Sequence, residues 1–117
     1  MPKFNSSLKK DTAFEKKTKY HKHLLEKINH VSEEIKKAGG EKAIEKIHSQ
    51  RKLHARERIE LLIDNGTFFI ELGLYAAYGM YKESGGAPSS GTIFGIGKIH
   101  DRDCVIVAND ATVKAGA

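Results

Sequence analysis

The sequence predicts an α/β protein in which helices come first and strands follow. Two observations lead to this class. Before Gly66 the apolar residues recur at spacings of three, four and seven, which is typical of amphipathic helices. After Gly66 the pattern changes to short runs of β-branched and aromatic residues between glycine-rich turns, which favours strands. With 117 residues, the chain is long enough for one ordinary domain.

The first and longest helix is expected over residues 12–38. Thr12 and Glu15 form a capping-box pattern at its start, and the glycines at 39 and 40 can adopt the left-handed conformation that ends a helix. Its apolar stripe consists of Phe14, His21, Leu24, Leu25, Ile28, Val31 and Ile35. Two shorter helices are expected over residues 41–49 and 53–64, the second closed by Asn65 and Gly66.

Strands are expected from residue 67 onward: a short one over 67–72, and a hairpin of 92–100 and 104–108 with a turn at 101–103. Between them, the composition of residues 83–91 predicts a loop. Gly95 and Gly97 alternate on one strand, which lets another part of the chain approach closely.

The second hairpin strand contains Val105, Ile106 and Val107 in a row, a pattern typical of a strand covered on both faces. One hairpin and one short strand are too little sheet to provide that cover. We therefore expect the chain to be incomplete, with the missing partners in polypeptide after Ala117.

Composition narrows the class of protein. Charged residues make up 30% and apolar residues 39%, and no apolar run is long enough to cross a membrane. The single cysteine, Cys104, allows no disulfide framework, so a reducing, cytoplasmic compartment is expected.

Positive charge is concentrated in the first half of the chain. Residues 1–60 hold 16 Lys and Arg against 9 Asp and Glu, which gives +7, whereas residues 61–117 hold 4 against 6, which gives −2. A basic half could attract nucleic acid, an anionic surface or a phosphorylated small molecule, or it could be a solvated helix face with interleaved acids.

The densest basic cluster surrounds the start of the third helix. Its members are Arg51, Lys52, Arg56 and Arg58. Free amides at a helix start, together with basic side chains, can form a phosphate site. The structural alternative is that these cations pair with the neighbouring acids Glu57, Glu60 and Asp64.

Other candidate sites are weaker. His21, His23 and His30 lack the spacing of metal ligands on one helix face, so no metal site is predicted. No nucleophile–base pattern is present, and Gly95-x-Gly97 precedes no helix, which argues against a dinucleotide site. The pair Asn109 and Asp110, directly after a strand, either caps the next segment or orients a loop.

Six short segments, taken in order, resemble the N-terminal part of the carboxyltransferase β subunit of biotin-dependent acyl-CoA carboxylases, the propionyl-CoA and methylcrotonoyl-CoA carboxylase group. The segments are 40–43 (GEKA), 51–59 (RKLHARERI), 62–66 (LIDNG), 69–72 (FIEL), 95–97 (GIG) and 108–113 (ANDATV). The family commonly continues with Lys-Gly-Gly, whereas this chain has Lys114-Ala115-Gly116. If that position needs a positive φ, Ala115 is strained.

The resemblance implies a crotonase-like (ClpP/crotonase) fold of ββα units, truncated in this chain. Residues 1–38 would be a helical extension and residues 39–117 the start of the N-terminal carboxyltransferase domain. In this family, carboxybiotin on a carrier domain of another chain carboxylates an acyl-CoA. Backbone amides of glycine-rich turns hold the enolate. Those turns would lie beyond Ala117, so no catalytic residue is assigned here and the isolated chain is expected to be inactive.

The resemblance also gives the basic cluster a role, since coenzyme A (CoA) carries several phosphates. Arg51, Lys52 and Arg56 are the expected contacts to them. Expected partners are the acyl-CoA, a biotin carboxylase or biotin carrier subunit, and further β subunits in a homo-oligomer, with no nucleic acid and no membrane. The alternatives are a basic, helix-rich nucleic-acid-binding module and a non-catalytic assembly piece that docks through the long helix.

Overall fold

The computed structural model describes residues 7–116, so residues 1–6 and 117 of the two expected domains lie outside the described part. The chain divides into two compact units, Met1–Val31 and Ser32–Ala117. The expected domain boundary between residues 38 and 39 stays a prediction. The described part of the second unit, residues 32–116, is called the sheet unit.

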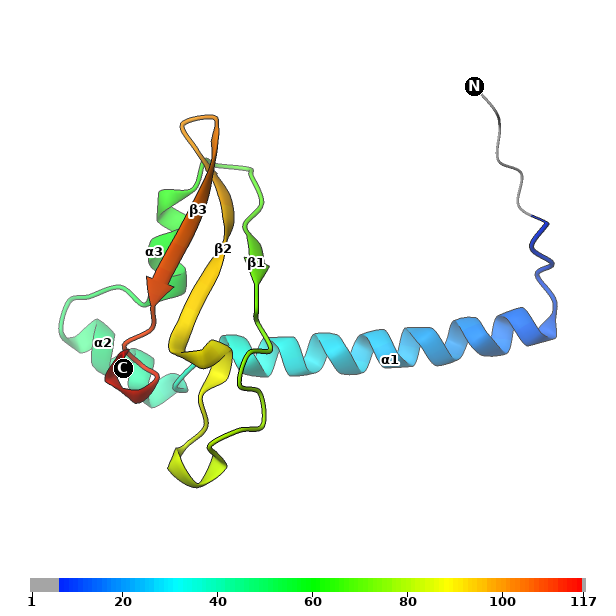
Figure 1. The fold of residues 1–117 in the computed structure, drawn as a ribbon, viewed down its shortest axis with the longest axis horizontal. Helices are drawn as coiled ribbons and strands as arrows, with labels where there is room; N and C mark the ends of the chain where they lie inside the picture. The colour runs from blue at the N-terminus through cyan, green and yellow to red at the C-terminus, as the bar shows by residue number, and fades with distance from the viewer. Residues whose placement is uncertain (1–6, 117) are drawn as a thin grey trace. The chain divides into compact units, whose positions relative to one another are not determined.

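Helices precede strands, as predicted (Figure 1). The helices are α1 (Thr12–Lys36), α2 (Glu41–Ser49) and α3 (Ala55–Leu62), and the strands are β1 (Ile70–Leu72), β2 (Thr92–Ile99) and β3 (Arg102–Asn109). Short 3₁₀ turns occupy Lys82–Ser84, Pro88–Gly91 and Lys114–Gly116. No helix among residues 7–116 is both long and apolar enough to cross a membrane.

Both ends of α1 differ in detail from the prediction. The cap is Asp11, one residue before Thr12, because the Asp11 carboxylate accepts the N–H of Phe14 at 2.9 Å. At the other end the left-handed residue is Ala38, with φ 54°. Gly39 is needed for a different reason, since a Cβ there would clash with the backbone carbonyl of Thr112.

The three strands form one antiparallel sheet in the order β1-β2-β3. One face of the sheet, here called the inner face, packs on α3 through a core of Ala55, Ile59, Ile93 and Ile106. Gly95 lies on this face, and a Cβ there would clash with the Ile70 carbonyl oxygen and the Phe69 ring. The prediction that the alternating glycines permit close approach is therefore confirmed.

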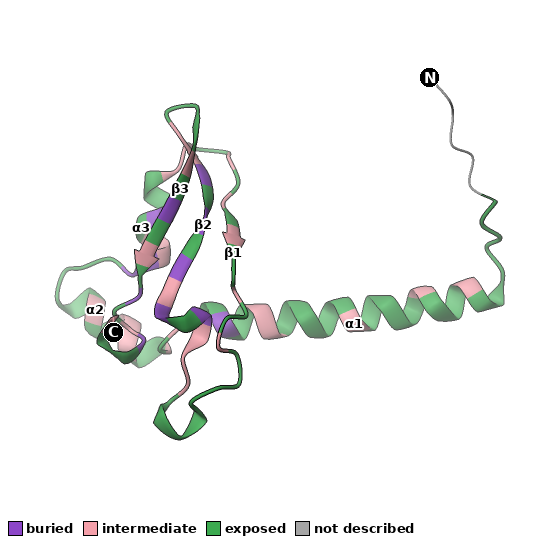
Figure 2. Ribbon diagram, viewed as in Figure 1, coloured by how far each residue is buried: buried purple, intermediate pink, exposed green. Residues whose placement is uncertain are grey.

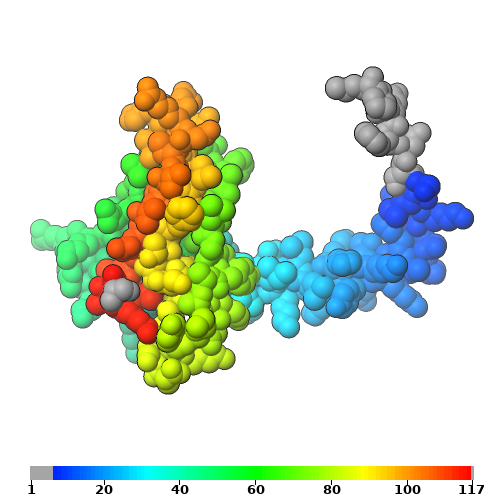
Figure 3. All heavy atoms as spheres, viewed as in Figure 1, coloured from blue at the N-terminus to red at the C-terminus, as the bar shows by residue number. Residues whose placement is uncertain are grey.

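The opposite, outer face of the sheet is apolar and exposed. Its members are Ile70, Leu72, Phe94, Ile96, Val105 and Val107. Buried and exposed residues alternate along β2 in Figure 2, and no other described segment lies over the three strands in Figure 3. Within residues 7–116, the row Val105–Val107 is thus covered on one face only, because Ile106 alone points toward α3.

The hairpin turn is shorter than predicted. It consists of His100 and Asp101, with φ of 50° and 60°, while Arg102 already pairs with Ile99. The Asp64 carboxylate accepts the N–H groups of both turn residues at 2.8 Å each. Because this contact comes from outside the hairpin, the local sequence did not indicate the two-residue turn.

Candidate functional site

A groove of about 430 Å³ lies in the sheet unit, between the α2–α3 connection and the segment after β3. The first side of the groove is built from the end of α2, residues 51–54 and the first turns of α3. The second side is residues 109–112. The lining residues are Ile47, Arg51, Lys52, Leu53, His54, Ala55, Arg58, Asn109, Asp110, Ala111 and Thr112.

The groove collects part of the basic cluster. Arg51 and Lys52 line it, as does Arg58. Arg56 does not line it and instead forms a two-pronged ion pair with Glu71 of β1, at 2.6 and 2.8 Å. Both side chains of this pair are largely buried. The partner of Arg56 is therefore Glu71 rather than any of the three acids near it in the sequence.

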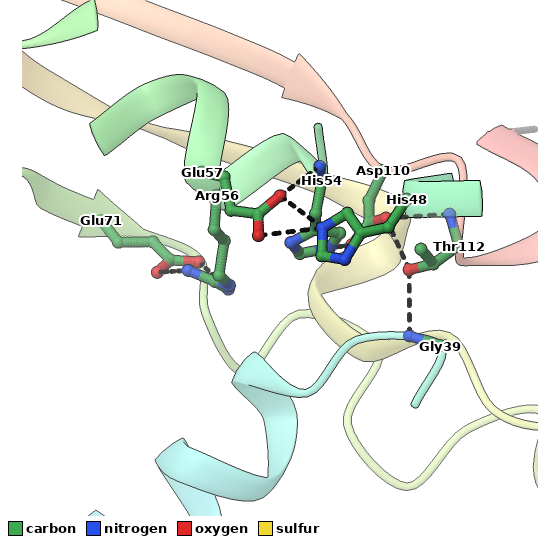
Figure 4. Close-up of polar contacts among 8 residues, drawn as sticks. All are labelled: Gly39, His48, His54, Arg56, Glu57, Glu71, Asp110 and Thr112. Atoms are coloured by element: carbon green, nitrogen blue, oxygen red, sulfur yellow. Dashed lines mark hydrogen bonds and ion pairs between the residues drawn. The ribbon is translucent and has the colours of Figure 1, made fainter. Parts of the chain in front are cut away.

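His54, Asp110 and Thr112, which line the groove, belong to a buried polar network (Figure 4). The Nε2 atom of His54 lies 3.1 Å from Oδ2 of Asp110, and the two side chains are 6% and 5% exposed. The other Asp110 oxygen accepts the Thr112 N–H at 2.9 Å and its hydroxyl at 2.6 Å. The same hydroxyl oxygen accepts the N–H of Gly39 at 3.1 Å. Three segments that are distant in sequence are tied together at this point.

Glu57 ties α2 to the start of α3. Its carboxylate accepts the backbone N–H of His54 at 2.7 Å and lies 2.9 Å from Nε2 of His48. These two contacts, the His48 one first, hold the pKa of Glu57 below its ordinary value. Because Glu57 follows His54 by three residues, it forms the reciprocal half of a capping box at the start of α3.

Sequence reasoning missed His54 as a site residue and underestimated Asp110. The Asn109–Asp110 step was expected to make local backbone bonds, and the bond from the Thr112 N–H confirms that expectation. The long-range bond to His54 was not foreseen, because 56 positions separate the two residues. The available signal was a histidine inside the basic run 51–58.

The departure at position 115 has the predicted consequence. Ala115 adopts φ 55° and ψ 23°, in the left-handed region that favours glycine. The preceding Lys114 lies 4.5 Å from the centre of the Tyr81 ring, which holds this turn against the 73–91 segment.

The chemistry that the groove offers is anion binding. Three cations line it, and its buried acid is already bonded to a histidine and to Thr112. Among residues 7–116 there is no group of three or more His, Cys, Asp or Glu side chains that could hold a metal ion.

Comparison with known proteins gives one consistent result. The family described as the carboxyl transferase domain matches residues 46–117. The methylcrotonoyl-CoA carboxylase beta chain of Dictyostelium discoideum is 51% identical over 92 residues, covering 79% of this chain and 16% of its own length. The biotin-dependent 3-methylcrotonyl-coenzyme A carboxylase beta1 subunit of Mycobacterium tuberculosis is 44% identical over 96 residues, covering 82% and 18%.

Among solved structures, the beta subunit of Pseudomonas aeruginosa geranyl-CoA carboxylase matches with a TM-score of 0.84 at 25% identity, over 99% of this chain and 22% of that one. These matches confirm the predicted resemblance and the crotonase-like fold class, and nothing in them supports the nucleic-acid alternative. The chain spans about a sixth of the length of the curated relatives it matches, 16% in the first case.

Proposed function

The chain belongs to the carboxyl transferase domain family, and on this premise we propose that its protein transfers a carboxyl group from carboxybiotin to an acyl-CoA. The observation that carries this proposal is the match over residues 46–117, because that span contains the complete basic groove. The names of the relatives, methylcrotonoyl-CoA carboxylase beta subunits, support an acyl thioester as the acceptor.

The contribution of this chain is to hold the phosphates of CoA. Arg51 and Lys52 line the groove at the approach to α3, where arginine can bind a phosphate through two parallel N–H groups and lysine adds a point charge. Arg58 is a third lining cation that the sequence alone did not select. Arg56 stays a prediction, since it would have to leave Glu71 to reach a ligand in this groove.

The chain supplies binding rather than bond-making groups. The biotin would arrive on a carrier domain of another chain, and when present it provides the carboxyl group. We also propose a biotin carboxylase or carrier subunit and further copies of the β subunit as partners. The cytoplasmic location stays a prediction that rests on the unpaired Cys104.

Titration of CoA into the full-length protein tests the assignment. Arg51→Ala and Lys52→Ala should each weaken binding about tenfold, which corresponds to the ~1.4 kcal/mol expected for one charge-assisted contact. Arg102→Ala, an exposed arginine at the start of β3, is the matched control and should leave the dissociation constant unchanged.

Two outcomes would count against the assignment. Unchanged CoA affinity in both groove variants would remove these residues from the site. An equal loss of CoA affinity in Arg102→Ala would show that the effect comes from net charge rather than from contacts in the groove. The Arg56→Ala variant belongs in the same series. If it folds normally and binds CoA more weakly, Arg56 belongs to the CoA site after all.

A further inference from the structure

The long helix α1 carries an apolar stripe of which one end is buried and the other is exposed. Ile35, near the end of the helix, is 4% exposed, whereas Leu25 on the same stripe is 57% exposed. Most of α1 is drawn as exposed in Figure 2. Helices in proteins owe most of their stability to packing of an amphipathic face rather than to their own hydrogen bonds. The exposed part of the stripe is therefore a surface for a partner.

A shallow groove of about 430 Å³ runs along this part of the helix, and cations line it together with apolar side chains. It is here called the α1 groove, and its lining residues are Phe14, Lys17, Thr18, His21, Lys22 and Leu25. Two lysines at the other end of α1 are paired with glutamates three residues before them. Lys17 and Lys22 form no ion pair within residues 7–116, so the α1 groove offers free positive charge beside apolar surface.

Net charge distinguishes between the possible occupants of this groove. Residues 7–31 hold 7 Lys and Arg against 3 Asp and Glu, which gives +4, whereas residues 32–116 hold 12 against 12, which gives zero. Pairing of α1 with α1 of a second copy would bring two charges of +4 together, and like charges oppose association. The sheet unit of a second copy offers no net attraction. An acidic surface is the complementary one.

The pattern of the stripe favours a protein over a lipid surface. Lys17 and His21 follow Phe14 by three and seven residues, so they lie on the apolar face itself rather than on the polar side of the helix. Helices that lie in a membrane interface keep their charged residues on the face away from the lipid chains. A protein groove can instead pair a cation in the seam with a carboxylate, which lowers the cost of burying it.

The helix is separate from the part of the chain that carries the family match. That match begins at residue 46, after the end of α1. The solved beta subunit of geranyl-CoA carboxylase nevertheless matches 99% of this chain, so the resemblance to that protein extends over α1. A role in contact between subunits accounts for a helix that lies outside the common domain and recurs in a beta subunit.

Resting on the proposed function, we propose that the α1 groove docks the biotin-carrying subunit of the enzyme. The partner surface would be an apolar one with carboxylates, placed so that apolar side chains meet Phe14 and Leu25 and the carboxylates meet Lys17 and Lys22. The contact combines burial of apolar area with charge-assisted hydrogen bonds.

Biolayer interferometry with the full-length protein and the purified biotin-carrying subunit tests the docking. Lys17→Glu with Lys22→Glu should weaken binding at least about tenfold, because two attractive contacts become repulsive. The matched control is Lys19→Glu with Lys27→Glu, which changes the net charge equally at exposed positions of α1 outside the groove. It should weaken binding much less, and an equal loss would overturn the proposal.

The double variant Phe14→Ser with Leu25→Ser tests the apolar half of the contact and should also weaken binding about tenfold. If this variant loses helix content in circular dichroism, hydrogen exchange of residues 14–25 in the wild-type protein decides. The partner subunit should slow that exchange, and unchanged exchange would overturn the docking.

Two other occupants are separate outcomes of the same series. Loss of self-association in sedimentation velocity, with binding of the biotin-carrying subunit unchanged, would assign the groove to a second copy. Loss of binding to vesicles of phosphatidylglycerol and phosphatidylcholine, again with subunit binding unchanged, would assign it to a membrane. Either result overturns the proposal. CoA affinity should be the same in all variants, and a wild-type protein that binds no CoA would refute the proposed function instead.

Discussion

The two faces of the sheet are made by alternate residues of the same strands, yet their surroundings are opposite. On the inner face Ile93 is 1% exposed and packs with α3, whereas on the outer face Val105 is 67% exposed. Both faces are apolar, so composition does not distinguish them. The difference shows that strand alternation decides which apolar residues contribute to stability, and that contact with α3 decides which face is the core.

The largest expected difference concerns isoleucines on β2. Ile93→Ala should reduce the free energy of unfolding by about 2–5 kcal/mol, because it leaves a cavity between sheet and helix. Ile96→Ala, three residues along and on the outer face, should cost less than about 1 kcal/mol since water already reaches that side chain. Urea-induced unfolding of the two variants measures both, and equal losses would erase the distinction between the faces.

Replacing glycines of β2 with alanine tests how tightly the inner face is packed. Gly95→Ala should cost about 1–3 kcal/mol, because the new Cβ meets the β1 backbone at Ile70, which cannot rotate away. Gly97→Ala is the matched control and should cost less, since its Cβ meets side-chain methyl groups of Ile63 and Ile106 rather than backbone. Hydrogen exchange at Ile70–Leu72 should accelerate in Gly95→Ala alone. Unchanged exchange there would contradict the close approach.

Substitution of Asp64 tests the hairpin turn between β2 and β3, which fixes which residues of these strands face inward. The N–H groups of Asp101 and then His100 hold its pKa below the ordinary 3.8. A lowered folded-state pKa means that this stabilisation is complete above the unfolded value and is lost as pH falls through the folded one. Asp64→Asn should therefore unfold more easily at pH 7 but lose less stability than wild type below about pH 4.

Acid titration of unfolding, with Asp103→Asn on the same hairpin as the control, measures this effect. If the free energy of unfolding falls in parallel in wild type and Asp64→Asn as pH is lowered, the Asp64 carboxylate does not stabilise the turn.

The smallest effect on stability is expected for the outer face. The double substitution Val105→Thr with Val107→Thr should change the free energy of unfolding by less than about 0.5 kcal/mol, because both side chains are already hydrated. It should also reduce self-association in sedimentation velocity, since an exposed apolar patch favours contact between copies. Ile106→Thr, which lies between them on the inner face, should destabilise clearly. A large loss in the double variant would mean that the outer face is covered in solution.

Much of the fold could be predicted from short-range pattern. The apolar spacing from Phe14 to Ile35 predicted α1, and the glycine-bounded apolar runs predicted β2 and β3. Family resemblance in segments such as 51–59 and 108–113 then gave the fold class. One error is local, since Asp11 rather than Thr12 caps α1, and two others arise where a distant residue intervenes. Asp64 shortens the hairpin turn, and Thr112 gives Gly39 a packing role in place of a capping one.

The candidate site divides in the same way. The sequence by itself determined a cluster of cations at the start of α3, because helix position and charge are local properties. Only the tertiary structure placed Arg51 and Lys52 in the groove, directed Arg56 to Glu71 and brought Asp110 within hydrogen-bonding distance of His54. The physical reason is that a buried ion pair or hydrogen bond depends on which segments meet in space, and chain spacing does not contain that information.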